Sequence, residues 1–142
     1  MVTFDFGNGP IPAHKHSNGG GWIAENARIE ETAYVGPQAK VYGNAQVCGK
    51  AWISGAAEIA GSSKVYGNVM VFDNAKVYGN AWIYGNAEVA GNAKVYDNAQ
   101  ISGNAWVFDN AEVAGNAVVS DNAWISGDAK IAPLQNSSIT LI

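Results

Sequence analysis

The side chains best suited to binding or catalysis gather in one short stretch near the N-terminus. It holds both histidines of the chain, a lysine between them, three successive glycines and a tryptophan. Successive backbone N–H groups can form an anion-binding concavity, lysine and imidazole supply positive charge or donors, and an indole offers a stacking surface. We therefore predict a site for a small anionic ligand here. Its residues are His14, Lys15, His16, Asn18, Gly19, Gly20, Gly21 and Trp22.

The same stretch has a purely structural interpretation, as a cap over the segment that follows it. Glycine-rich turns are ordinary in such caps, and the three glycines are not a Walker A loop because no Gly-Lys-Ser or Gly-Lys-Thr follows them. Both interpretations remain open from the sequence.

Composition narrows the classes of function. The 142 residues include 8 Lys plus Arg and 12 Asp plus Glu, for a net charge of −4, and the single cysteine is Cys48. The lack of a basic run argues against binding to duplex nucleic acid, and one cysteine excludes an internal disulfide framework. No apolar stretch is long enough to span a membrane. We expect no metal, no cofactor, no catalytic residue, no membrane partner and a cytoplasmic location.

A strict repeat begins at residue 23. Val or Ile occupies every sixth position from Ile23 to Ile131, without an insertion. A small residue, nearly always Ala, stands two positions earlier, and Gly or Asp stands two positions later in most units. A period of six does not fit the 3.6-residue turn of a helix. The spacing of two within each unit predicts a short strand, and Gly-Asn or Asp-Asn predicts a corner.

Strands and corners of constant length predict a solenoid with a dry aliphatic interior. The predicted organisation is an N-terminal cap with the His-Gly segment at residues 1–21, a repeat at residues 22–132 and a C-terminal tail at residues 133–142. The β-prone end of that tail, residues 138–142, could close the last coil or pair with a neighbouring chain.

The repeat resembles the hexapeptide-repeat family, whose signature is an aliphatic residue, three variable residues, a small residue and one more. Residues 77–82 and 89–94 show that pattern. The resemblance implies an all-β fold: a single-stranded parallel β-helix that is left-handed and triangular, with 18 residues per coil and about six coils. It also implies a homotrimer with parallel axes. Many members are acyltransferases that use acyl-coenzyme A or acyl-carrier protein and a histidine as general base.

Eighteen residues per coil place the outward side chains in three columns. The first two columns mix charged and aromatic residues, whereas the third is aromatic with one acid and no base. An exposed apolar strip of that length favours a subunit interface, and a platform for stacking bases or sugar rings is the alternative. The predicted interface residues are Tyr34, Trp52, Met70, Phe72, Trp106, Phe108 and Trp124.

Together these features favour a non-catalytic trimer that binds a small anionic, nucleotide-like ligand at the N-terminal segment and at the subunit interfaces. The compact cluster before a near-perfect repeat is similar to small phage-encoded hexapeptide-repeat proteins, which implies a bacterial or phage-infected cell and a signalling nucleotide as ligand. The alternatives are an O- or N-acyltransferase that depends on acyl-coenzyme A, and a purely structural spike or scaffold.

Overall fold

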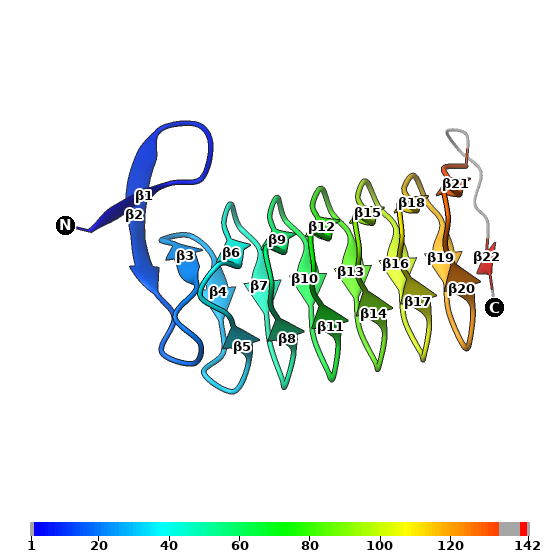
Figure 1. Ribbon diagram of the computed structural model, residues 1–142, viewed down its shortest axis with the longest axis horizontal. Coiled ribbons are helices and arrows are strands. Elements are labelled where there is room, and N and C mark those ends of the chain that lie inside the picture. The colour runs from blue at the N-terminus through cyan, green and yellow to red at the C-terminus, as the bar shows by residue number, and fades with distance from the viewer. Residues whose placement is uncertain (1, 134–139, 142) are drawn as a thin grey trace.

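A computed structural model describes residues 2–133 and 140–141. Within these residues the chain forms short strands and turns and has no helix, so no helix long and apolar enough to cross a membrane is present. The strands stack into three sheets that wrap one central column, and successive coils lie side by side along the long axis of the molecule (Figure 1). The predicted all-β solenoid of about six coils is therefore confirmed.

The first sheet runs the full length of the molecule and includes the N-terminal hairpin. From β3 onward its strands are parallel, and residues 18 positions apart are partners, as Trp22 is to Lys40. The order is β1 (Thr3–Asp5), β2 (Pro10–Lys15), β3 (Trp22–Ala24), β6 (Lys40–Val41), β9 (Glu58–Ile59), β12 (Lys76–Val77), β15 (Lys94–Val95), β18 (Glu112–Val113) and β21 (Lys130–Ile131).

The second sheet is wholly parallel and ends with a strand from the C-terminal tail. That strand, β22, pairs with β19, and Leu141 packs against the core. The β-prone tail thus closes the last coil; residues 138, 139 and 142 of the predicted segment lie outside the described residues. The order is β22 (Thr140–Leu141), β19 (Val118–Val119), β16 (Gln100–Ile101), β13 (Trp82–Ile83), β10 (Lys64–Val65), β7 (Gln46–Val47) and β4 (Arg28–Ile29).

The third sheet carries the aromatic column and is also wholly parallel. Its pairs again join residues 18 apart, as Met70 joins Glu88. The order is β20 (Trp124–Ile125), β17 (Trp106–Val107), β14 (Glu88–Val89), β11 (Met70–Val71), β8 (Trp52–Ile53) and β5 (Tyr34–Val35). The three columns predicted from the sequence are therefore the outer faces of the three sheets, called here the first, second and third face.

The core is the column of Val, Ile and Ala that the period of six predicts. Nearly every residue of this column has no exposed surface, and only those at the two ends, such as Ile29 and Ile131, are partly exposed. Ser63 is the one polar side chain at an inward repeat position, and its hydroxyl donates to Ala60 O over 2.7 Å. Because this hydroxyl has a hydrogen-bond acceptor, its burial in the apolar core costs little free energy of folding.

The corners depend on residues that accept a left-handed backbone. Most corners place Gly there, and Asp73, Asp97, Asp109 and Asp121 adopt the same conformation with φ between 55 and 59°. The carboxylate of Asp73 accepts the N–H of Gly91 one coil further on, at 3.1 Å, and Asp97 and Asp109 repeat this bond. Each of these aspartates thus offsets its backbone strain by satisfying a corner N–H.

Candidate functional site

The predicted anion site forms a tight turn at the N-terminal end of the solenoid. His16 N donates to Gly21 O over 2.8 Å, and Gly20 N donates back to His16 O over 3.0 Å. This turn follows β2, which pairs antiparallel with β3 and places Lys15 beside Trp22. All eight predicted residues therefore lie close together, on β2, the turn and the start of β3.

Two side chains of this turn are directed at the first coil. The His16 ring is 6% exposed, and its Nε2 lies 2.8 Å from Ala33 O. Asn18 Nδ2 donates to the same oxygen over 3.1 Å, while Asn18 O accepts the N–H of Val35. These contacts satisfy backbone groups that an open first coil would otherwise leave exposed, so His16 and Asn18 act as a cap.

The three glycines have a packing role in the same turn. Gly21 N donates to Val35 O over 2.9 Å. A Cβ at Gly19 would collide with Val35 O, and one at Gly21 would collide with the Val35 side chain. The N–H groups of Gly20 and Gly21 already have protein acceptors, and they are therefore not available to an anion in this conformation.

Trp22 is in contact with residues of its own N-terminal hairpin. Phe4 stacks on it with a centroid distance of 4.8 Å and an interplanar angle of 22°, and Lys15 Nζ lies 5.5 Å from its centroid. Phe6 stacks in the same way on Tyr42, at 5.1 Å. The hairpin is thus fastened to the first face by aromatic stacking.

The predicted residues that stay open to solvent are His14 and Lys15. A shallow hollow of about 310 Å³ beside His14 is lined by Val2, Pro12, Ala13 and Glu25 as well. Among the described residues no group of three His, Cys, Asp or Glu could hold a metal ion. The anionic ligand stays a prediction, and it now depends on His14 and Lys15.

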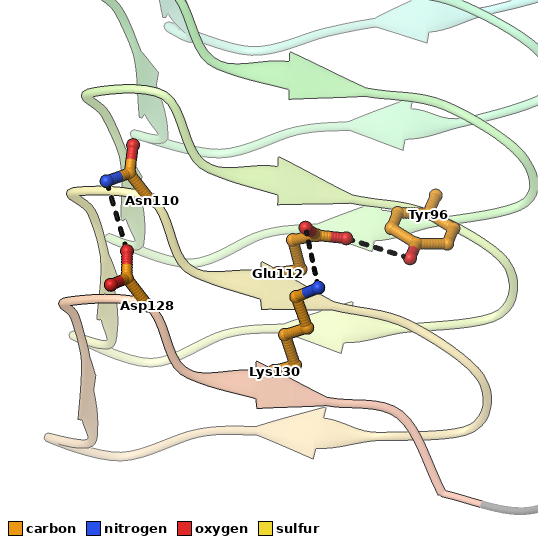
Figure 2. Close-up of polar contacts among 5 residues, drawn as sticks. All are labelled: Tyr96, Asn110, Glu112, Asp128 and Lys130. Atoms are coloured by element: carbon orange, nitrogen blue, oxygen red, sulfur yellow. Dashed lines mark hydrogen bonds and ion pairs between the residues drawn. The ribbon is translucent and has the colours of Figure 1, made fainter.

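The first face contains two tyrosine–glutamate pairs that are joined by hydrogen bonds. Tyr42 Oη donates to Glu58 over 2.8 Å, and Tyr96 Oη donates to Glu112 over 3.1 Å. Figure 2 shows the second pair, in which Lys130 also approaches Glu112 at 4.0 Å. Burial, the hydrogen bond and the charge of Glu58 raise the pKa of Tyr42 from 10.0 to about 12.

The raised pKa of Tyr42 predicts that the folded protein becomes less stable at alkaline pH. Between pH 10 and about 12 a tyrosine in the unfolded chain loses its proton while Tyr42 in the folded chain keeps it. The free energy of unfolding should therefore fall as pH rises through this interval. Urea unfolding of the natural chain and of Tyr42→Phe tests this, since the variant should lose less stability over that interval. Equal pH slopes in the two proteins would contradict the assignment.

The third face bears the exposed aromatic strip. Tyr34 stacks on Trp52 at a centroid distance of 4.0 Å, and Trp106 stacks on Trp124 at 5.2 Å. Trp106 is 40% exposed and Trp124 is 64% exposed. The strip is interrupted at one coil, where Glu88 lies between Met70 and Trp106 of the neighbouring strands. Ala90 holds the position that Phe72 and Phe108 hold one coil before and one coil after.

A hollow of about 310 Å³ lies at that interruption. Ala90 and Gly91 lie at its base, and the large rings around it belong to Phe72, Trp106 and Phe108. The remaining lining residues are Glu88, Val107 and the two corner acids Asp73 and Asp109. Sequence reasoning noted Glu88 as the one acid of this face but did not find the hollow. The replacement of a large aromatic residue by Ala90 is visible in the sequence only when residues 18 positions apart are compared.

Comparison with known proteins supports the architecture. A family model described as "YdcK Beta solenoid repeat" matches residues 99–114, which in this structure run through β16, β17 and β18. The chain is a β-solenoid repeat protein. No curated protein and no solved structure was found to match it.

Proposed function

We propose that this β-solenoid protein is a non-catalytic homotrimer that assembles through its third face and acts as a binding scaffold. The supporting observation is the aromatic strip on that face, in which Trp52, Trp106 and Trp124 are each at least 40% exposed. Although Glu88 interrupts the strip, monomeric soluble proteins rarely expose apolar surface of this extent on one face.

The other two faces differ in ways that favour exposure to water. The column on the first face consists of lysines and glutamates from Lys40 onward, and each glutamate lies between two lysines, as Glu58 lies between Lys40 and Lys76. On the second face Lys64 Nζ lies 5.2 Å from the Trp82 ring centroid, so this tryptophan has a cationic neighbour of its own chain. The third face has no lysine or arginine in its strands. The number of subunits, three, comes from the resemblance to hexapeptide-repeat proteins.

Trp106→Glu is expected to convert the trimer into single chains, because it places a charge in the centre of the buried strip. Trp82→Glu is the matched control, since both tryptophans are 40% exposed and occupy equivalent strand positions on different faces. Light scattering coupled to size exclusion measures the mass of each protein. A single-chain mass for the natural protein, or loss of the trimer in both variants, would contradict the proposal.

The anionic ligand is the second part of the hypothesis and rests on the exposure of His14 and Lys15 at adjacent positions of β2. Native mass spectrometry of freshly purified protein would report the number of subunits and any retained small molecule in one measurement. The alternative of acyl transfer would have to use His14 as general base, because His16 is buried and its Nε2 contacts a backbone oxygen.

A further inference from the structure

One repeat unit, Glu-(Ile or Val)-Ala-Gly, occurs three times in the chain. Two copies lie on the first face, at residues 58–61 and 112–115, and one lies on the third face, at residues 88–91. The alanines Ala60, Ala90 and Ala114 are all buried. Each copy therefore places a glutamate beside a buried alanine, and a hollow is seen at the copy on the third face.

On the first face both glutamates have partners within the chain. Tyr42, from the coil before, donates to Glu58, and Tyr96 donates to Glu112 in the same way. Lysines also occupy the strand positions on both sides: Lys40 and Lys76 flank Glu58, and Lys94 and Lys130 flank Glu112. Each carboxylate is thus compensated by a hydroxyl and by two positive neighbours.

Glu88 lacks all of these partners. Phe72 takes the place that tyrosine holds in the other two copies and has no hydroxyl to donate. The strand neighbours are Met70 and Trp106, which carry no charge. In the described part of the chain no hydrogen bond or ion pair involves the Glu88 carboxylate, although the residue is only partly exposed. A partly desolvated carboxylate without a partner favours a positive group from outside the chain.

The hollow around Glu88 has the lining of a site for such a group. We name it the Glu88 notch and define it by Phe72, Glu88, Ala90, Trp106 and Phe108. Two further carboxylates, Asp73 and Asp109, stand at its corner, each with one oxygen bound to a glycine N–H. No lysine, arginine or histidine lines it. Its charge is therefore negative and its walls are aromatic.

The spacing of the coils that carry Phe72 and Phe108 bears on the shape of the group that could bind between them. The backbone positions of Phe72 and Phe108 are two coils apart, which corresponds to roughly 9.6 Å at the usual strand spacing. A flat ring sandwiched between two others needs only about 7–8 Å, at carbon contacts of about 3.5–4.0 Å. A rounded ammonium group midway between these two positions would lie about 5 Å from each coil, and cation–π attraction acts within about 6 Å of a ring centroid. A hydrated metal ion would find too few oxygen ligands and too much apolar wall.

We propose that the Glu88 notch binds an organic ammonium ion, with the alkylated nitrogen between Phe72 and Phe108 and its charge facing Glu88. A single chain already forms the hollow, with nine lining residues. In an assembly through the third face the bound cation would lie between subunits.

Titration with tetramethylammonium chloride, followed by NMR at constant ionic strength, tests the site. The natural protein should bind the ion saturably, with shifts of the Trp106 indole resonance, whereas tert-butanol, of similar shape and no charge, should bind about tenfold more weakly. Glu88→Gln should weaken tetramethylammonium binding by about tenfold. Glu112→Gln, the same change in the equivalent repeat unit of the first face, should leave binding unchanged.

Phe72→Tyr tests directly whether the missing hydroxyl donor leaves Glu88 available to the cation. It adds one oxygen and recreates on the third face the tyrosine–glutamate pair seen between Tyr42 and Glu58. Glu88 then has an internal donor, and binding of the cation should weaken about as much as in Glu88→Gln while the fold is kept, as circular dichroism would show. Saturable binding by neither the natural protein nor Trp52→Glu, a variant expected to dissociate the trimer while keeping the notch lining, would overturn the proposal, and so would equal affinity for tert-butanol. Light scattering on the same samples reports the subunit number separately, so a failure of the trimer and a failure of the notch are distinguishable.

Discussion

Gly61→Val should lower the free energy of unfolding by about 2–6 kcal/mol. Gly61 has a φ of 65° at a corner, where a β-branched residue is strained by roughly 1–3 kcal/mol. A Cβ at this position would also lie 2.7 Å from Gly79 N in the next coil, and forcing such a contact costs about 1–3 kcal/mol more. Chemical unfolding followed by circular dichroism measures the change.

Two further variants separate strain from collision. Gly127 has nearly the same φ, 63°, but no atom of the described residues lies within 4 Å of its hypothetical Cβ, so Gly127→Val should show the strain alone. Gly61→Asp meets the same Cβ contact but should be tolerated better than Gly61→Val, because its carboxylate could accept the N–H of Gly79, as Asp97 two coils later accepts the N–H of Gly115. Equal losses in Gly61→Val and Gly127→Val would show that the stacked coils give way more easily than the distances imply.

Deletion of residues 1–21 should remove the protein from solution as a single species. The deletion takes away β2, the antiparallel partner of β3, and the turn that binds Ala33 O and both backbone groups of Val35. The first coil would then present open strand edges and the end of an apolar shaft. Uncovered edges of this kind associate with other chains, and solenoids depend on capped ends for solubility.

The soluble fraction after expression and the mass by light scattering measure this effect. His14→Ala is the control, because His14 is exposed and its loss leaves the cap contacts in place. His16→Ala should fall between the two, since it removes one buried ring and one hydrogen bond but keeps β2. A truncated chain that stays soluble with the melting temperature of the natural protein would show that residues 1–21 do not cap the solenoid.

The sequence was sufficient to predict the architecture because the aliphatic series has no interruption. Eighteen equal steps from Ile23 to Ile131 leave a single register, and that register alone sorts the outward side chains onto three faces. The aromatic strip of the third face followed directly, since Trp52, Trp106 and Trp124 differ by multiples of 18. Periodicity thus predicted which residues share a surface.

The roles of irregular residues could not be predicted in this way. Three glycines in a row are compatible with an open anion site and with a tight turn. Only the structure shows that Gly19 and Gly21 leave room for Val35 and Gly36, and that Gly20 has a φ of 82°. Glu58 and Glu88 occupy the same place in the repeat unit, yet one has a hydroxyl donor and the other has none. That difference depends on a residue in the preceding coil, which a comparison of adjacent hexapeptides does not include.

Because every coil has 18 residues, the length of the solenoid can change without a change in the face on which each side chain lies. Excision or duplication of one whole coil would shorten or lengthen the shaft by about 4.8 Å and leave every later side chain on its original face. Insertion of a single hexapeptide would instead rotate everything beyond it by a third of a turn. The tryptophans on either side of the Glu88 notch would then point in different directions, although every inward Val and Ile would still be in place.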